Sequence, residues 1–93
     1  MIYKHRNIMI DSNRWICIKD DEIVNLTHTE FVILMFLIEG KDKVLTREYC
    51  KTNIFYHDGE EMTNQLDVYI NYLRNKLGKD LIRTVRKVGY ILD

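Results

Sequence analysis

The sequence predicts one α+β domain with an N-terminal antiparallel β-meander, three helices and a C-terminal β-hairpin. Short strand-like runs separated by turn residues occupy both ends of the chain, and apolar residues at helical spacing occupy its middle. A chain of 93 residues can build one hydrophobic core and has little room for a second. We therefore expect residues 1–93 to fold as a single domain.

Three short strands are expected before the first helix. Residues 8–10 are an apolar run, and the Asp-Ser-Asn sequence at residues 11–13 marks a turn after it. Residues 14–18 are expected to form the second strand. The Asp pair at residues 20–21 marks the next turn, and residues 23–24 form the third strand. Strands joined by such short turns pair as antiparallel neighbours.

The first helix is predicted from its cap and its apolar spacing. Thr27 can cap the helix N-terminus, and Glu30, three residues later, completes a capping box. Apolar residues follow at positions i, i+3, i+4 and i+7, namely Phe31, Leu34, Met35 and Ile38. Because further apolar residues cover its other sides, this helix is expected at the centre of the core, and Gly40 is expected to end it.

Two more helices are expected after the first. Thr46 is another N-cap residue and starts a helix that runs to about residue 54. The segment from Phe55 to Met62 contains an Asp-Gly pair and is expected to form a loop. The third helix is expected over residues 63–77, and Gly78 ends it. It buries one stripe of side chains: Leu66, Ile70, Leu73 and Leu77.

The C-terminal hairpin is expected to have strands over residues 81–85 and 90–92. Two helices followed by such a hairpin make the winged helix-turn-helix arrangement. Arg86 and Lys87 are adjacent at the turn. An arginine on a protruding ribbon suits the narrow minor groove of DNA, where the potential is most negative. An ordinary solvated turn would also carry charged residues.

The net charge of the chain is zero, but the charges are unevenly distributed. Residues 1–62 hold 8 basic and 11 acidic residues, which gives a net charge of −3. Residues 63–93 hold 6 basic and 3 acidic residues, which gives a net charge of +3. If the chain binds a nucleic acid, we expect the C-terminal third to contact the phosphates.

The face of the third helix opposite its apolar stripe is polar and almost uncharged. Its centre carries Asn64, Val68, Asn71 and Asn75, its flanks carry Gln65 and Tyr72, and its edges carry Arg74 and Lys76. A solvated helix face usually carries Glu and Lys, which favour both helix and water. Asn and Gln can instead hydrogen-bond to adenine, and an exposed Val can pack on a thymine methyl group. This face is therefore typical of a base-reading helix, with a merely polar surface helix as the alternative.

Three segments of the chain, taken in order, carry a resemblance to a known family. They are Leu26-Thr27-x-x-Glu30-Phe31 at the first helix, Leu45-Thr46-Arg47-Glu48 at the second, and Leu66-Asp67-Val68-Tyr69-Ile70 with Leu73-Arg74-Asn75-Lys76-Leu77, Thr84-Val85-Arg86 and Gly89-Tyr90 at the third helix and hairpin. The set resembles the effector domain of OmpR/PhoB-type response regulators over nearly the whole chain. The resemblance implies sequence-specific binding of double-stranded promoter DNA for transcriptional regulation in a bacterial two-component system.

The resemblance also implies residue roles and partners. Asn64, Val68, Asn71 and Arg74 would face the major groove, Arg86 would reach the minor groove, and Thr84 and Lys87 would lie near phosphates. The loop from Phe55 to Met62 matches a segment that can contact RNA polymerase in this family. The phospho-accepting receiver domain of the family lies outside this chain. Because the sequence has no heptad seam and no large apolar patch, we expect a monomer in solution. The resemblance implies two copies on tandem half-sites when the domain binds DNA.

Four positions on the third helix modify this expectation. Asp67 would repel phosphate if it faced DNA, so we interpret it as a structural residue, with Arg47 as a candidate partner. Asn64, Asn71 and Tyr72 stand where relatives commonly carry Arg. Fewer cations mean fewer phosphate contacts, and therefore a weaker dependence of DNA affinity on salt.

Other classes of function find little support in the sequence. Its three His and two Cys residues lack zinc-ligand spacing, and no nucleophile lies near a base, so neither a metal, a cofactor nor an enzyme activity is expected. Cys17 and Cys50 are expected to be reduced core thiols of a cytoplasmic protein. No signal peptide or membrane span is expected. A winged-helix module that binds proteins rather than DNA is the alternative function.

Overall fold

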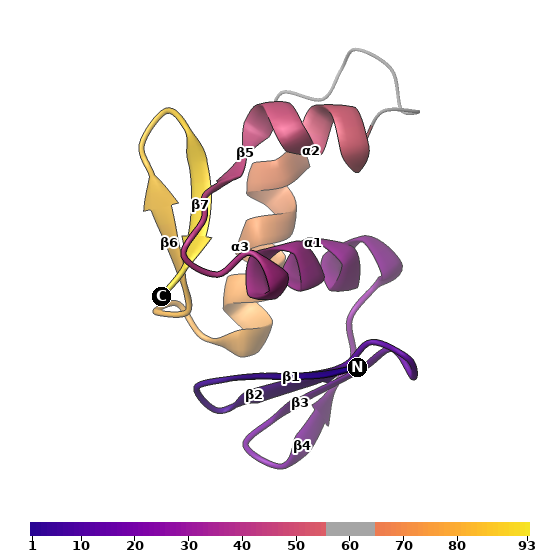
Figure 1. Ribbon diagram of the computed structural model, residues 1–93. Coiled ribbons are helices and arrows are strands. Elements are labelled where there is room, and N and C mark those ends of the chain that lie inside the picture. Colours follow the sequence, from indigo (N-terminus) through magenta and orange to yellow (C-terminus); the bar gives the residue numbers. More distant parts are fainter. Residues whose placement is uncertain (56–64) are drawn as a thin grey trace.

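The computed structural model describes residues 1–55 and 65–93 of the chain. Within these residues, the N-terminal sheet lies at one end of the molecule, and α2 and the C-terminal hairpin lie at the other, with α1 between them (Figure 1). This is the winged helix-turn-helix arrangement that the sequence predicts. Among the described helices, none has the length and apolar composition needed to cross a membrane.

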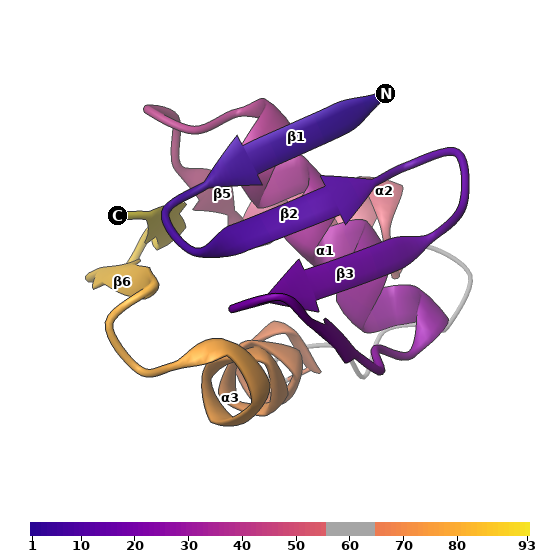
Figure 2. The ribbon, with the colours of Figure 1, turned by 90° about the horizontal axis from the view of Figure 1, so that it is seen from below.

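The N-terminal sheet contains four strands rather than the predicted three. They are β1 (Ile2–His5), β2 (Ile8–Asp11), β3 (Ile16–Lys19) and β4 (Glu22–Val24), and each pairs antiparallel with the next. β1 was not predicted, because Lys4 and His5 end the short apolar run at its start. The prediction that the second strand starts at residue 14 was wrong, since Trp15 has a φ of 57° and lies in the turn. Figure 2 shows α1 crossing behind this sheet.

The helices are α1 (His28–Glu39), α2 (Arg47–Asn53) and α3 (Gln65–Leu77). The predicted capping box of α1 is confirmed, because Thr27 Oγ1 accepts from the Glu30 amide and the Glu30 carboxylate accepts from the Thr27 amide. Thr46 Oγ1 caps α2 by accepting from the Tyr49 amide at 3.0 Å. Gly78, with a φ of +111°, follows the last residue of α3. The predicted start of that helix, at residues 63–64, lies outside the described residues.

The C-terminal hairpin, which we call the wing, consists of β6 (Ile82–Val85) and β7 (Gly89–Leu92). A two-residue strand, β5 (Leu45–Thr46), pairs with β7 and joins the wing to the start of α2. Its two residues are too few to show a strand pattern in the sequence. A Cβ on Gly89 would lie 2.0 Å from the Leu45 carbonyl oxygen, so only glycine allows this close approach of the two backbones.

The core is formed by α1, the apolar stripe of α3 and the inner faces of both sheets. All four predicted stripe residues of α3 are buried: Leu66, Ile70, Leu73 and Leu77. Cys17 and Cys50 are free and buried, as predicted. Burial raises the pKa of Cys17 to about 11 and that of Cys50 to about 12, so both thiols stay protonated at neutral pH.

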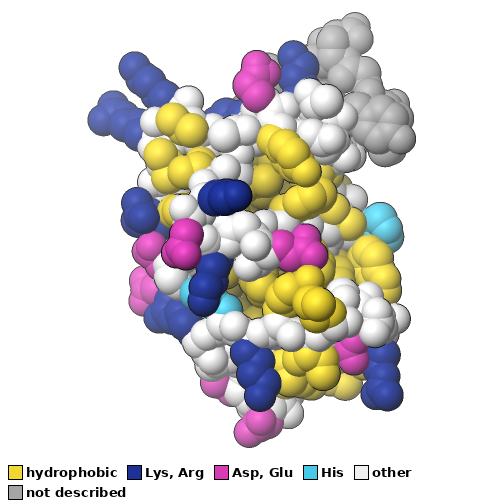
Figure 3. Space-filling view, in the orientation of Figure 1, with side chains coloured by type: hydrophobic (Ala, Val, Ile, Leu, Met, Phe, Trp, Pro, Cys, Tyr) yellow, Lys and Arg dark blue, Asp and Glu magenta, His cyan; other side chains and the backbone are white. Residues whose placement is uncertain are grey.

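One apolar surface was not predicted. The side of α1 away from the core borders a groove of about 220 Å³, and Trp15 and Phe31, which line it, pack with tilted rings and 4.5 Å between ring centroids. Figure 3 shows hydrophobic side chains exposed in this region of the surface. The groove exists because α1 is apolar on all sides, whereas the sheet and α3 cover only part of it.

Leu73→Ala tests the packing of α3. Leu73 has no exposed surface, so its truncation should lower the free energy of unfolding by roughly 2–5 kcal/mol. Asn75→Ala, on the exposed face of the same helix, is the control and should change it by no more than about 0.5 kcal/mol. Urea denaturation measures both. Equal and small losses in the two variants would show that the apolar stripe does not hold α3 to the core.

Candidate nucleic-acid interface

The side of α3 away from the core presents the residues that the sequence predicts to face DNA. Val68 is 41% exposed and Tyr72 is 47% exposed, and Asn71 and Asn75 are exposed as well. Gln65, the first described residue of the helix, is half-buried, and Asn64 lies outside the described residues. The predicted division of α3 into a buried and an exposed face is therefore confirmed, and contact with bases stays a prediction.

The loop that precedes α3 begins with a buried aromatic residue. Phe55 is buried and its ring stacks on Tyr69 of α3, with 5.9 Å between centroids. Phe55 therefore packs in the core, and the contact of this loop with RNA polymerase stays a prediction. The rest of the loop, residues 56–62, lies outside the described residues.

The turn of the wing carries two exposed cations, Arg86 and Lys87. Lys87 has a φ of 67°, and the amide of Val88 donates to the carbonyl of Val85 at 2.9 Å, which closes the turn. The amide of Arg47, at the start of α2, donates to the Val88 carbonyl at 3.1 Å. The wing lies beside α3 (Figure 1), so both predicted DNA-contacting elements belong to one part of the surface.

Two cationic side chains of α3 bind groups of the protein itself. Arg74 donates to the Ile82 carbonyl at 2.8 and 3.2 Å and to Thr84 Oγ1 at 3.0 Å. Lys76 pairs with Glu30 at 2.7 Å, and only 2% of Glu30 is exposed. Arg74 and Thr84, both predicted to contact DNA, thus bind each other here, and the sequence pattern did not reveal this contact.

Asp67 lies between α2, α3 and the wing. Its Oδ1 accepts a hydrogen bond from Arg47 Nη1 at 2.8 Å and another from the Tyr90 hydroxyl. The interpretation of Asp67 as a structural residue paired with Arg47 is therefore confirmed. Tyr90, the second partner, was not predicted, because a hydroxyl on a buried strand residue leaves no periodic signal in the sequence.

These contacts decide the protonation states. Burial alone would raise the pKa of Asp67, but the hydrogen bonds from Tyr90 and Arg47 outweigh it and hold this pKa below its ordinary value. Burial and the hydrogen bond to Asp67 raise the pKa of Tyr90. At neutral pH the cluster therefore contains a charged carboxylate and a neutral phenol that donates to it.

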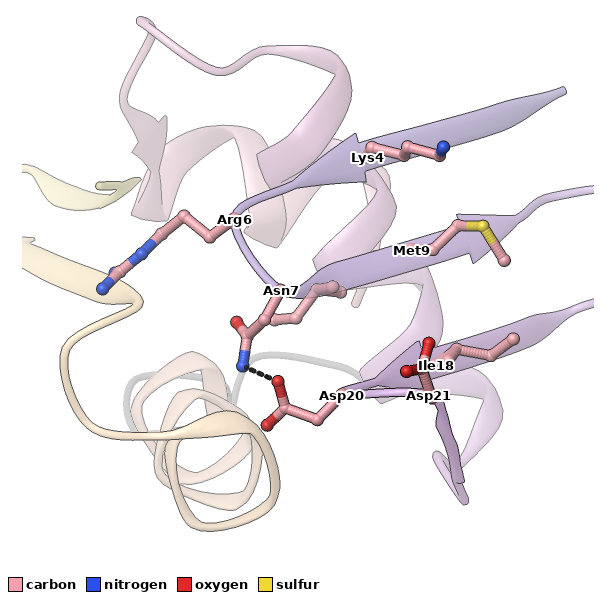
Figure 4. Close-up of a pocket in the computed structure, with 8 residues that line it drawn as sticks. Lys4, Arg6, Asn7, Met9, Ile18, Asp20 and Asp21 are labelled. Atoms are coloured by element: carbon pink, nitrogen blue, oxygen red, sulfur yellow. Dashed lines mark hydrogen bonds between the residues drawn. The ribbon is translucent and has the colours of Figure 1, made fainter.

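A separate hollow of about 480 Å³ lies on the N-terminal sheet (Figure 4). Lys4 and Arg6 line it together with Asp20 and Asp21, so its charges balance. Asn7 donates to the Asp20 carboxylate at 2.9 Å, and Arg6 donates to the Asp80 carbonyl at 3.2 Å. This hollow offers a phosphate group no excess of positive charge, unlike the tip of the wing.

Asp67→Asn tests the charge of this cluster. The pKa of Asp67 is lower in the folded protein than in the unfolded chain, where it is about 4, so its contribution to stability is present above pH 4 and is lost as the pH falls through the folded-state pKa. Because the pair is partly exposed, the variant should lose about 1 kcal/mol at pH 7. Urea denaturation between pH 7 and pH 3 should show the gap to wild type closing below about pH 4. A gap that stays constant to pH 3 would contradict a charged Asp67.

Comparison with known proteins agrees with this geometry. The family described as "Transcriptional regulatory protein, C terminal" matches residues 20–92. The response regulator ArlR of Staphylococcus saprophyticus is 44% identical over 91 residues, which cover 94% of this chain and 41% of that protein. The chain thus spans about two fifths of the length of such curated relatives.

Solved structures agree as well. The DNA-binding domain of the response regulator AdeR, solved in complex with an intercistronic region, has a TM-score of 0.83 and 32% identity, with 98% of this chain and 97% of that chain covered. DrrB of Thermotoga maritima, an OmpR/PhoB homologue, has a TM-score of 0.85 and 26% identity, with 98% and 43% covered. From its fold, its two-sided α3 and these matches, the chain belongs to the family of C-terminal, winged-helix DNA-binding domains of OmpR/PhoB-type response regulators.

Proposed function

We propose that α3 reads base edges in the major groove of promoter DNA while the wing inserts Arg86 into the adjacent minor groove. The observation that carries this proposal is the two-sided character of α3. Val68, Asn71 and Asn75 are exposed to solvent on one face, and the apolar stripe on the opposite face is buried. Amide side chains can bond to adenine, and a Val side chain can pack on a thymine methyl group. The exposed cations of the wing supply the charge that this face lacks.

The wider assignment follows the family. The AdeR domain was solved bound to DNA, and its similarity over nearly the whole chain supports DNA binding here rather than a purely protein-binding module. We propose that the domain acts in the bacterial cytoplasm as the output of a two-component system, joined to a receiver domain. It would act as a monomer alone and as two copies on tandem half-sites about one helical turn apart. RNA polymerase is a further proposed partner, through residues 56–62.

The proposal is tested first by salt. A duplex selected from a random library and a scrambled duplex are titrated with the domain, using fluorescence anisotropy at several salt concentrations. A DNA reader prefers the selected duplex and loses affinity as salt rises, because cations leave the phosphates when the protein binds. The same weak affinity for both duplexes at low salt would favour a module that binds proteins.

Asn71→Ala tests base reading by α3. The variant should lose about 1–3 kcal/mol of binding free energy on the selected duplex and far less on the scrambled one, because only the former places a matching base opposite the amide. Asn13→Ala, in an exposed turn of the N-terminal sheet, is the matched control and should change neither. Equal losses of Asn71→Ala on both duplexes would reject a base contact.

Arg86→Ala and Lys87→Asn test the wing. Arg86→Ala should lose about 1–3 kcal/mol and relax a preference for A·T pairs beside the major-groove site, because a guanidinium suits a narrow minor groove. Lys87→Asn removes the other charge with a residue that tolerates positive φ. It should lose less, equally on all sequences, and lower the salt slope by about 1 unit. If Arg86→Ala keeps both the affinity and the A·T preference, the wing does not enter the minor groove.

A further inference from the structure

Two side chains of α3 bind the two strands of the wing. Asp67 accepts from the Tyr90 hydroxyl on β7, and Arg74 donates to the carbonyl of Ile82 on β6. Because Asp67 and Arg74 are seven residues apart, two helical turns separate them and both lie on the same side of α3. Arg74 also donates to Thr84, which is the cross-strand partner of Tyr90. The helix therefore holds both strands of the wing.

Tyr90 is enclosed by this set of contacts. Tyr90 is only 5% exposed, and the guanidinium carbons of Arg47 and Arg74 each lie 5.5 Å from the centroid of its ring. Such contacts add cation–π attraction to the hydrogen bond with Asp67. We call the set of Arg47, Asp67, Arg74 and Tyr90 the wing clamp.

The base of the wing is anchored by the pairing of β7 with β5 and by Ile82 and Leu92 in the core. Its tip, residues 86–88, is exposed. The clamp adds directional hydrogen bonds to this apolar anchoring, which by itself is non-directional. We infer that the wing clamp is a positioning device for DNA recognition, which sets where the tip of the wing lies relative to α3 and thereby lets Arg86 reach the minor groove. This inference rests on the proposed function of α3 and the wing.

The geometry also gives Arg74 a different role from the one that the sequence indicated. Its guanidinium makes three hydrogen bonds to β6 and lies over the ring of Tyr90. A side chain held in this way is a positioning residue, which acts on DNA through the wing rather than by reading a base. The minor groove is only about 6 Å wide, so a small rotation of the wing at its base is enough to misplace Arg86.

Tyr90→Phe and Arg86→Ala, alone and combined, test the inference on the selected duplex. Tyr90→Phe keeps the buried ring and removes only the hydroxyl that Asp67 accepts from. It should weaken binding about 3- to 10-fold when Arg86 is present, and should have no further effect in the Arg86→Ala background. Equal losses in both backgrounds, or no loss in either, would overturn the inference, because the clamp would then not act through Arg86.

The DNA sequence supplies a second readout that a loss of stability cannot produce. Changing the A·T pairs beside the major-groove site to G·C should abolish the difference between wild type and Tyr90→Phe. Asp67→Ala, which removes the acceptor of both hydrogen bonds, should behave in the same way. If Asp67 merely repelled phosphate, Asp67→Ala would instead raise affinity on every duplex, which would contradict the clamp. Tyr3→Phe removes a tyrosine–carboxylate hydrogen bond of 2.8 Å, to Glu39, far from the wing, and should change nothing.

The free protein tests the clamp without DNA. Spin labels on Lys79→Cys and Val88→Cys report the distance between the end of α3 and the tip of the wing by double electron–electron resonance, and Val88 is an exposed turn residue without a positive φ. The native thiols are buried and protonated, so they should not react with the label. Tyr90→Phe and Asp67→Ala should shift or broaden the distance distribution, whereas Tyr3→Phe should not. Unchanged distributions in both clamp variants would overturn the inference.

The two assays separate failure of the inference from failure of the proposed function. If the wild-type domain shows no preference for the selected duplex, the proposed function fails, whatever the variants do. The spin-label distances then still decide whether Asp67 and Tyr90 fix the wing. If the wild-type domain prefers that duplex but Tyr90→Phe behaves identically in both assays, only the inference fails.

Discussion

The carboxylate of Asp67 lies where α2, α3 and the wing meet, and the relative placement of these elements depends on it. Arg47 brings the start of α2 to this carboxylate, and Tyr90 brings β7. Without this carboxylate, the Arg47 guanidinium and the largely buried Tyr90 hydroxyl would each lose a hydrogen-bond acceptor. The resulting loss of folding free energy is larger than that from breaking one exposed ion pair. An acidic residue on the helix that we propose to face DNA is thereby compatible with DNA binding, because its charge is balanced by Arg47 within the protein.

Other charged side chains near the proposed interface also bind groups of the protein itself. Arg74 is bound to β6 and Lys76 to the buried Glu30, so the positive charges on α3 stabilise the fold. The exposed face of α3 is left with neutral Asn, Val and Tyr side chains, and Arg86 and Lys87 on the wing supply exposed cations beside it. In the proposed DNA complex, we expect such a domain to depend more on base contacts than on phosphate contacts, in keeping with its zero net charge.

Local patterns in the sequence predicted much of the fold and one face of the site. The capping box at Thr27, the apolar stripe of α3 and the glycine after that helix have short-range signatures, and each has the predicted structure. β1 and β5 were missed because their formation depends on partner strands rather than on their own pattern. Two contacts of the wing join residues that are separate in the sequence. They are the hydrogen bond from Tyr90 to Asp67 and the hydrogen bond from Arg74 to the Ile82 carbonyl. No periodicity encodes these contacts, so the exposure of α3 was predictable and the wing clamp was not.

We propose that one surface, formed by α3 and the clamped wing, reads adjacent major and minor grooves. Dimethyl sulfate footprinting on the selected duplex tests this most directly, because the reagent methylates guanine N7 in the major groove and adenine N3 in the minor groove. We expect α3 to protect guanine N7 within the major-groove site that it covers, and Arg86 to protect adenine N3 in the flanking A·T pairs. Arg86→Ala should remove only the adenine protection. Protection in one groove alone with the wild-type domain, or none, would contradict this proposal.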